Sequence, residues 1–333
     1  MTKTRIEWAD AVWNPVSGCS PVSPGCLNCY AQRFARRLAG RYGYLKGNPF
    51  SVTLHPERVL DPLHWHKPRR IFVCSMGDLF HDDVPFDFVD QIMAVVALAP
   101  QHTFMVLTKR PARMLEYFAS PERRVDRRAE IDLWRHVGGS YQINTYCGMI
   151  PDKLWPLPNL WVGTTVEDQK RADERIPILL WTPAALRFVS MEPMLGPIDL
   201  SDFKPFDGEC YCQDGLRGCK PRLTPNCPET GVDWVICGGE TGHGSRPMHP
   251  DWVRSLRDQC RNADVPFFFK SWGDLLPASQ VLPEQDQSFI PTRKIYQSSS
   301  VDVFLGKEYW GRIGKKIAGR LLDGQEYSEF PAV

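Results

Sequence analysis

The sequence lacks the long apolar runs that secretion and membrane insertion require. No segment has 18 successive apolar residues, so no membrane-spanning helix is predicted. The first residues, MTKTRIEWADAVW, contain no apolar core of a signal peptide. We therefore expect a cytoplasmic protein that makes no contact with membranes. In the reducing cytoplasm, clustered cysteines are more often metal ligands or catalysts than disulfides.

The sequence also lacks an excess of charge of either sign. Its 40 Lys and Arg residues nearly balance 39 Asp and Glu residues, which leaves a net charge of +1. This excludes the global basic field of obligate nucleic-acid binders. Local charge is less even, because residues 109–135 are rich in basic side chains and four arginines lie close together, Arg33, Arg36, Arg37 and Arg41. Solvated helix faces are the simplest interpretation of such clusters.

Short apolar runs rich in Val, Ile, Phe and Trp recur along the chain and predict strands buried on both faces. They lie at 69–75, 102–108, 159–165, 186–191, 233–239 and 265–271, with an early one near 5–9. Helical patterns separate several of them, at 87–100, 167–181 and 249–264, and Pro177 is expected to break or kink the second. Alternating strands and helices predict an α/β fold with a parallel sheet. The strand count favours a full or partial (β/α) barrel, TIM-like, over an open sheet.

Composition divides the chain further. Residues 204–232 are rich in Gly, Pro and Cys and have almost no apolar periodicity, which predicts a Cys-rich insert. We expect a barrel domain over 1–276 that carries this insert. Residues 277–333 are expected to form an irregular segment and a short helical tail with a turn at Asp323-Gly324, packed on the barrel.

Polar residues follow the predicted strands in succession. In barrels the active site is built from the loops at the carboxyl ends of the strands. These positions therefore predict a binding site. The residues that mark it are Asp78, Thr108, Lys109, Arg110, Thr164, Thr165, Glu167, Ser190, Glu192, Gly238, Gly239, Glu240, Lys270 and Trp272. A capping role is the alternative for an acid such as Glu240, which lies in a Gly-rich turn.

Three cysteines lie close together near the start of the chain, Cys19, Cys26 and Cys29, in the spacing C-x6-C-x2-C. Tyr30, Phe34 and Leu38 follow at helical spacing and predict a helix that packs one apolar stripe. Structural zinc takes four ligands, and a [4Fe–4S] cluster needs four iron ligands. Three cysteines would therefore leave one iron open to an outside molecule. Zinc with a fourth ligand from elsewhere, and free thiols, stay open as alternatives.

A three-cysteine cluster with an open iron resembles the radical S-adenosylmethionine superfamily, whose members are full or partial (β/α) barrels with the cysteine loop after the first strand. The resemblance implies a [4Fe–4S] cluster that an electron donor reduces and that cleaves S-adenosylmethionine to a 5′-deoxyadenosyl radical. It also implies that Asp78, in "CSMGDLF", holds the amino group of methionine. The matching candidates for the ribose and carboxylate are Lys109, Thr164, Ser190 and Glu192. The common superfamily spacing is C-x3-C-x2-C, from which this chain departs.

Nearly the whole chain outside the insert resembles a phage and prophage family, the three-Cys-motif family. The resemblance is carried by "PGCLNCYA", "SMGDLFH", "LTKRP", "SMEPMLGPIDL", "DWVICGGETG" and "PFFFKSWG". It implies a partner protein encoded beside this one. By analogy with phage biology, and given the arginine clusters, we expect a nucleotide or nucleic-acid substrate that is modified or repaired.

A second cysteine cluster lies inside the insert and consists of Cys210, Cys212, Cys219 and Cys227. A bound metal would order a segment that has no apolar material of its own. Four thiolates suit structural zinc. No metal, and an auxiliary iron–sulfur cluster, stay open. Zinc at both clusters would give the alternative to an enzyme, namely a non-enzymatic module that binds nucleic acid.

Overall fold

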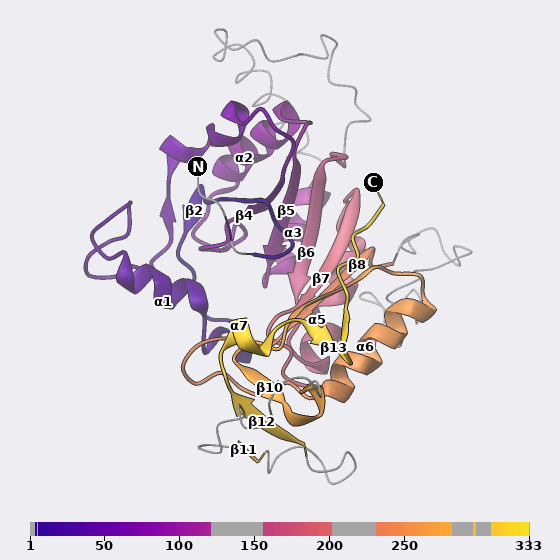
Figure 1. Cartoon of the computed structure of the whole chain (residues 1–333). Coiled ribbons are helices and arrows are strands. Elements are labelled where there is room, and N and C mark those ends of the chain that lie inside the picture. Colours follow the sequence, from indigo (N-terminus) through magenta and orange to yellow (C-terminus); the bar gives the residue numbers. More distant parts are fainter. Residues whose placement is uncertain are drawn as a thin grey trace. The chain divides into compact units, whose positions relative to one another are not determined.

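The computed structural model describes residue 4 and residues 6–120, 156–201, 231–281, 296–297 and 308–332. Within these ranges helices and parallel strands alternate along the chain, so the predicted mixed α/β class is confirmed (Figure 1). The Cys-rich insert predicted over 204–232 lies outside the described residues, apart from its last two positions. No helix in the described part of the chain is long and apolar enough to cross a membrane.

Seven strands form one sheet, and their order in the sheet is their order along the chain. They are β1 (Ala11–Trp13), β4 (Arg70–Val73), β5 (Thr103–Thr108), β6 (Leu160–Thr165), β7 (Leu186–Met191), β8 (Trp234–Gly238) and β9 (Phe267–Ser271). The pairs β1–β4, β4–β5, β5–β6, β7–β8 and β8–β9 are all parallel. This order has no reversal of the kind that defines doubly wound folds. The fold is therefore compatible with a partial (β/α) barrel.

Continuous burial explains why the strands could be located from the sequence. All six residues of β6 and all five of β8 are buried. A strand covered on both faces carries apolar side chains at most positions and reads as a near-continuous apolar run. The six runs from 69–75 to 265–271 accordingly coincide with strands, and these predictions are confirmed.

The prediction of a first strand near residues 5–9 is wrong. The first strand of the sheet is β1, which begins at Ala11. Trp8 is only 1% exposed, but it lies in a turn in which the Ala9 N–H donates to the Ile6 carbonyl at 3.2 Å. Apolar side chains buried from a turn produce the same short run as a strand, so the sequence pattern marks the wrong segment.

Three helices occupy the segments predicted for them, namely α2 (Phe86–Leu98), α5 (Gln169–Trp181) and α6 (Pro250–Asn262). The helix α5 continues past Pro177 to Trp181, so this proline does not break the helix, and the predicted kink stays a prediction. The helix α3 (Pro111–Ala119) follows β5 and begins with a proline at its first position.

The helix after the cysteines, α1 (Tyr30–Arg37), forms where predicted but packs a different face. Tyr30 is 50% exposed and Phe34 is 48% exposed, whereas Ala31 and Ala35 are buried. The small residues face the protein and leave the aromatic rings in solvent. The expectation that an aromatic stripe packs inward is therefore wrong.

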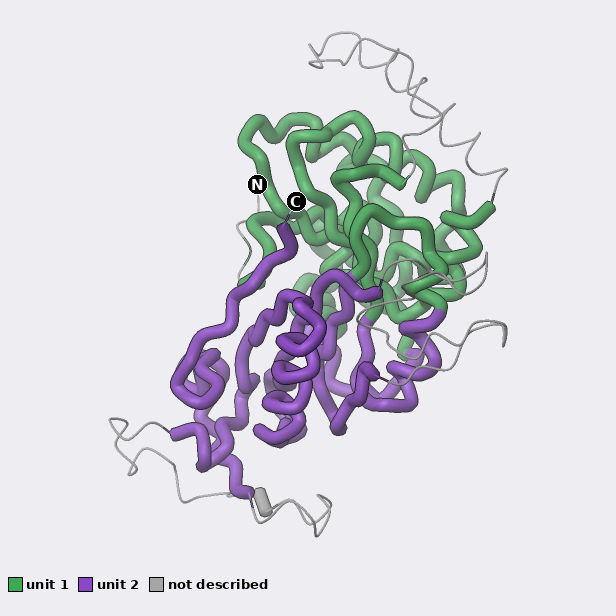
Figure 2. The backbone as a smooth tube through the Cα atoms, turned by 90° about the vertical axis from the view of Figure 1, so that its right-hand side faces the viewer, with its two compact units in different colours: residues 1–21, 31–164, 178–187 green, residues 22–30, 165–177, 188–333 purple. Residues whose placement is uncertain are grey.

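The chain divides into two compact units (Figure 2). Unit 1 comprises residues 1–21, 31–164 and 178–187, and unit 2 comprises residues 22–30, 165–177 and 188–333. The predicted boundary between 1–276 and 277–333 stays a prediction.

Short antiparallel elements complete unit 2. A small sheet has the order β10 (Leu275–Pro277), β12 (Tyr309–Arg312) and β11 (Tyr296–Gln297). The short helix α7 (Lys315–Ala318) precedes a hairpin of β13 (Leu321–Leu322) and β14 (Gln325–Glu326). The turn predicted at Asp323-Gly324 joins these two strands, and both residues have positive φ, at 52° and 76°.

Buried histidines should make the fold sensitive to acid. Burial lowers the pKa of four of them below the usual 6.5, namely His55, His81, His102 and His249. As the pH falls below 6.5 the unfolded chain takes up protons that the folded chain does not. The free energy of unfolding should therefore fall by up to about 1.4 kcal/mol per pH unit for each histidine. Urea denaturation at pH 7.5, 6.5 and 5.5 measures this slope.

The matched variants are His102→Gln, in which a buried ring is lost, and His66→Gln at an exposed position. The first should flatten the pH slope and the second should leave it unchanged. A free energy of unfolding that does not change between pH 7.5 and 5.5 would contradict neutral buried histidines.

Candidate functional site

Exposure separates the described cysteines into two groups. Cys19, Cys26 and Cys29 are partly exposed thiols outside any disulfide, whereas Cys74, Cys237 and Cys260 are buried. Burial raises the pKa of Cys74 to about 12 and also raises those of Cys237 and Cys260. Burial therefore keeps these three cysteines as inert thiols. The accessible thiols of the described residues are those of the predicted motif.

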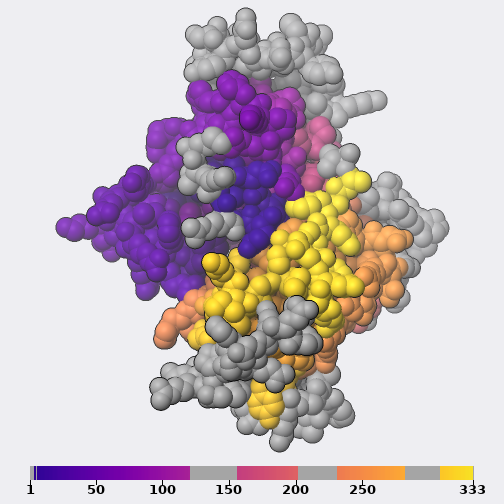
Figure 3. All heavy atoms as spheres, in the orientation of Figure 1, coloured from indigo at the N-terminus to yellow at the C-terminus, as the bar shows by residue number. Residues whose placement is uncertain are grey.

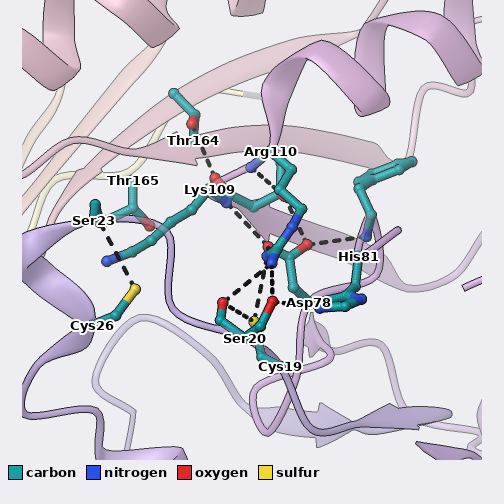
Figure 4. Close-up of polar contacts among 12 residues, drawn as sticks. Cys19, Ser20, Ser23, Cys26, Asp78, His81, Lys109, Arg110, Thr164 and Thr165 are labelled. Atoms are coloured by element: carbon teal, nitrogen blue, oxygen red, sulfur yellow. Dashed lines mark hydrogen bonds and ion pairs between the residues drawn. The ribbon is translucent and has the colours of Figure 1, made fainter. Parts of the chain in front are cut away.

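In unit 1, Cys19 lies beside an arginine that follows β5. The chain enters Cys19 through Gly18, which has a φ of +85° and no room for a side chain against the Ser51 backbone. Arg110 Nη1 lies 3.4 Å from Cys19 Sγ. Its Nη2 donates to the Ser20 carbonyl at 3.1 Å and to Ser20 Oγ at 2.9 Å (Figure 4). The guanidinium is therefore placed to neutralise a thiolate at Cys19.

Asp78 holds Arg110 in this position. The Asp78 carboxylate is 5% exposed and accepts from Arg110 Nη1 at 3.2 Å and from Thr108 Oγ1 at 2.7 Å. It also accepts from the backbone N–H groups of Phe80 at 3.0 Å and Lys109 at 3.3 Å. A carboxylate has about four acceptor positions. The chain itself fills them, so Asp78 acts here on Arg110, whose pKa it raises although burial opposes the charge.

The hydroxyl of Ser20 is oriented by a histidine with an assignable tautomer. His81 Nδ1 accepts from the Asp83 backbone N–H at 3.1 Å, so in the neutral ring the proton is on Nε2. Nε2 lies 2.7 Å from Ser20 Oγ and donates to it. Burial and the Arg110 charge lower the pKa of His81, which favours this neutral ring. Ser20 Oγ thus accepts from both His81 and Arg110, so the hydroxyl hydrogen of Ser20 points toward neither of these two groups.

In unit 2, a fully buried carboxylate after β6 holds the loop that carries Cys26 and Cys29. Glu167 is 0% exposed, and Ser23 Oγ donates to its Oε1. Arg175 on α5 donates to Glu167 Oε2 at 3.0 Å and to the Thr165 carbonyl at 2.6 Å. The loop approaches so closely that a Cβ at Gly25 would overlap the Glu167 carboxylate. Glycine at position 25 is therefore a requirement of this contact.

Glu240, after β8, holds the same loop from a second point. Asn28 Nδ2 donates to Glu240 Oε2 at 3.0 Å and to the Gly244 carbonyl at 2.8 Å. Arg246 pairs with Glu240 at 2.6 Å and donates to the Pro24 carbonyl at 3.1 Å. Burial alone would raise the pKa of Glu240, but the hydrogen bonds from Arg246 and Asn28 lower it overall. Glu240 is thus an ionised brace for the cysteine loop.

A partly exposed ion pair joins the ends of β7 and β9 in unit 2. Lys270 Nζ lies 2.6 Å from Glu192 Oε1, and Ser190 Oγ donates to Glu192 Oε2 at 3.2 Å. The side chain of Lys270 is 22% exposed and that of Glu192 is 16% exposed. Gly238 on β8 leaves room for the pair, because a Cβ there would lie 3.0 Å from Glu192 Oε1. An accessible charge pair at the carboxyl ends of parallel strands can bind a polar ligand.

The structure thus brings the predicted residues into separate groups. Within unit 1 it places Asp78 near Cys19 through Arg110, and within unit 2 it joins Glu192 to Ser190 and Glu240 to the cysteine loop. Thr164 is fully buried and donates to the Thr108 carbonyl at 2.9 Å. The four cysteines predicted to bind zinc, Cys210, Cys212, Cys219 and Cys227, lie outside the described residues.

Sequence reasoning missed Arg175 and Arg246, and it placed Arg110 and Glu167 among the polar residues after strands without identifying the cysteine-bearing chain as their partner. The signal that the sequence offers for these residues is their position relative to the predicted strands and helices. Arg110 and Glu167 directly follow predicted strands, and Arg175 lies two helical turns beyond Glu167.

The described residues contain no group of three or more His, Cys, Asp or Glu side chains arranged to hold a metal ion. The predicted iron–sulfur cluster therefore stays a prediction.

Comparison with known proteins places the chain in a family. A model described as "Protein of unknown function (DUF5131)" matches residues 3–331, nearly the whole chain. The chain belongs to the DUF5131 family. No curated protein and no solved structure matches it.

Gly25 offers a direct test of the loop in this DUF5131 chain. Replacing Gly25 with Ala would drive a methyl group into the Glu167 carboxylate, which Arg175 holds in place. We expect a loss of about 1–3 kcal/mol in the free energy of unfolding. We also expect faster modification of Cys26 and Cys29 by a thiol reagent. Urea denaturation and mass spectrometry of the modified thiols measure the two effects.

Gly47→Ala is the matched control, because a Cβ at Gly47 meets no atom within 4 Å. It should unfold and react as the unchanged protein does. Equal behaviour of the two variants would show that the loop does not rest on Glu167.

Proposed function

We propose that this protein is a cytoplasmic radical S-adenosylmethionine-type enzyme in which Cys19, Cys26 and Cys29 bind a [4Fe–4S] cluster. The observation that carries the proposal is the contrast among the described cysteines. Those of the motif are partly exposed and held by charged groups, whereas the other three are buried. Each of the three ligands is thus a thiol that a cluster can reach.

The donor set suits iron–sulfur chemistry. The Cys26 N–H donates to the Ser23 carbonyl at 2.9 Å, and the Cys29 N–H donates to the Cys26 carbonyl at 3.2 Å. One tight turn therefore leads into Cys26, and a second joins Cys26 to Cys29. Thiolates are the ligands that such clusters take. Three of them leave one iron position for a molecule from outside the chain.

When bound, the cluster with S-adenosylmethionine would supply a 5′-deoxyadenosyl radical that abstracts hydrogen from a substrate. The chain's own residues have supporting tasks. Arg110 offsets thiolate charge at Cys19, while Glu167 and Glu240 fix the loop of Cys26 and Cys29. The pair of Lys270 and Glu192, with Ser190, is proposed to orient the amino-acid or ribose groups of the cofactor.

The remaining assignments extend this proposal. Lys109, Thr164 and Asp78 stay candidates for contacts with S-adenosylmethionine, and a contact from Thr164 or Asp78 requires the ligand to displace a hydrogen bond that each makes within the chain. The substrate is proposed to be a nucleotide or nucleic acid, and an electron donor is required. A partner protein encoded beside this one is proposed from the three-Cys-motif resemblance, and zinc is proposed at the second cysteine cluster.

The ligand assignment predicts which cysteines are needed for iron. After anaerobic reconstitution, the unchanged protein should hold about four irons and four sulfides. The variants Cys19→Ala, Cys26→Ala and Cys29→Ala should each lose most of the iron and the visible absorption. Cys260→Ala is the control and should keep both, because Cys260 is buried in the core. A reconstituted protein that holds zinc but no iron would overturn the proposal and favour a zinc-binding module.

Cofactor cleavage tests the reaction class. With dithionite and S-adenosylmethionine, the loaded protein should form 5′-deoxyadenosine, which liquid chromatography detects. Lys270→Met should weaken S-adenosylmethionine binding at least about tenfold while leaving the iron content unchanged, since a charge-assisted contact is lost. Exposed Lys316→Met is the control. A protein that holds the cluster yet forms no 5′-deoxyadenosine would argue against radical chemistry.

A further inference from the structure

One stretch of unit 1 carries basic charge without any acidic residue nearby in the sequence. Between Asp10 and Glu57 there is no Asp or Glu. All the lysines and arginines of that interval fall within residues 32–46, which we call the basic segment, and they are Arg33, Arg36, Arg37, Arg41 and Lys46. The segment comprises most of α1 and the loop after it, and it protrudes from the rest of unit 1 (Figures 1 and 3).

Several of these cations have no counter-ion among the described residues. Arg36, Arg37 and Arg41 are exposed and pair with no carboxylate in that part of the chain. Other arginines behave differently, since Arg110 and Arg254 form ion pairs at 3.2 Å and 2.6 Å. Exposed guanidinium groups that no described carboxylate neutralises, in a protein of net charge +1, point to an anionic partner.

Exposed aromatic rings lie among these cations. Phe34 is 48% exposed and Tyr42 is 73% exposed. Phe34 precedes Arg37 by three residues on α1, so the two side chains are neighbours on one helix face. A membrane-binding helix separates its apolar and basic residues onto opposite faces. In α1 the middle of the apolar face, Ala31 and Ala35, is already buried against the protein, so that face is not free to enter a membrane. The exposed ring of Phe34 lies at the edge of that face, next to the arginines. Rings beside cations suit a chain of phosphates and bases, because each base offers a face for stacking.

The backbone holds Tyr42 in solvent at a cost. Its φ is 50°, in the left-handed region that bulky residues avoid. Arg58 Nη2 donates to the Tyr42 carbonyl at 2.7 Å, and the neighbouring Tyr44 is 6% exposed and anchors the loop. Gly43, with a φ of +80°, packs against the His55 ring. The loop thus exposes the ring of Tyr42. Because that ring is not buried, no burial energy offsets the unfavourable backbone conformation of Tyr42.

We propose that the basic segment binds single-stranded nucleic acid. Arg36, Arg37 and Arg41 contact phosphates, and Phe34 and Tyr42 stack on unpaired bases. The inference deepens the proposed function, on which it rests for the expectation that nucleic acid is the substrate. The binding itself requires no cluster, so the two proposals can fail separately.

Charge reversal tests the phosphate contacts. Binding of fluorescein-labelled dT20 is measured by anisotropy at several salt concentrations. We expect the variant R36E/R37E/R41E to bind at least about tenfold more weakly. Its slope of log K against log salt should be shallower by about 2, from three lost contacts at about 0.7 each.

The control K67E/K170E/K316E makes the same change in net charge at three exposed lysines outside the basic segment. It should bind nearly as tightly as the unchanged protein and keep its salt slope. Equal weakening in both triple variants would overturn the proposal, because it would show that only net charge matters. Circular dichroism confirms that each variant is folded.

Tyr42→Gly separates stacking from structure. Glycine accepts a positive φ without strain, so the melting temperature should rise. Binding of dT20 should nevertheless weaken at least about fivefold, which corresponds to the loss of one stacked base. A variant that gains stability and keeps its affinity would remove Tyr42 from the site.

Duplex DNA and anionic vesicles serve as competing probes. A 20-base-pair duplex should bind more weakly than dT20 and should not respond to Tyr42→Gly. Tighter binding to phosphatidylserine vesicles than to dT20 would overturn the assignment in favour of a membrane surface. Cys19→Ala should bind dT20 normally, so loss of the cluster and loss of nucleic-acid binding are distinguishable.

Discussion

The buried carboxylate of Glu167 is the contact on which the cysteine loop of unit 2 depends. A charge that is 0% exposed must be paired and hydrogen-bonded, since an isolated buried carboxylate is far too costly. Arg175 supplies the pairing charge and Ser23 supplies a hydrogen bond from the loop. Gly25 then packs directly on the carboxylate. Residues that are distant along the chain thereby fix the position of the loop that carries Cys26 and Cys29.

Buried ion pairs of this kind contribute more to position than to stability. Their Coulomb attraction is largely offset by the loss of hydration, whereas loss of one partner leaves an uncompensated charge. Glu240 with Arg246 in unit 2 and Asp78 with Arg110 in unit 1 follow the same rule. In each pair the arginine or its acid also contacts the chain beside a motif cysteine. We interpret the three pairs as positioning devices for that chain.

The strands of the sheet could be predicted from the sequence because burial on both faces leaves a near-continuous apolar run. The exception, β1, is three residues long and carries too little signal to be told from the buried turn at Trp8. The face of α1 was also unpredictable. Aromatic residues usually pack inward, and nothing local shows that Ala31 and Ala35 form the buried side instead.

The candidate site could be located from the sequence, but its contacts could not. Polar residues mark the carboxyl ends of the predicted strands, and Glu192 and Glu240 indeed lie just after β7 and β8. Their partners are set by the fold. Asn28 and Glu240 are 212 residues apart in sequence, and Ser23 and Glu167 are 144 apart. Local patterns contain no information about pairs at that separation, so an acid that braces a loop and an acid that binds a ligand look alike.

The contacts of Glu167 and Glu240 with the cysteine loop limit which group could be the fourth ligand of a metal site that has three thiols. Among the described residues, Glu167 and Glu240 are carboxylates that contact the loop of Cys26 and Cys29, and each would be an obvious fourth ligand. Each is already engaged by an arginine and by a loop side chain. Releasing either one would leave an arginine without its partner and free the loop that carries the thiols. The fourth position is therefore better filled from outside this pair of acids, as the proposed binding of S-adenosylmethionine requires.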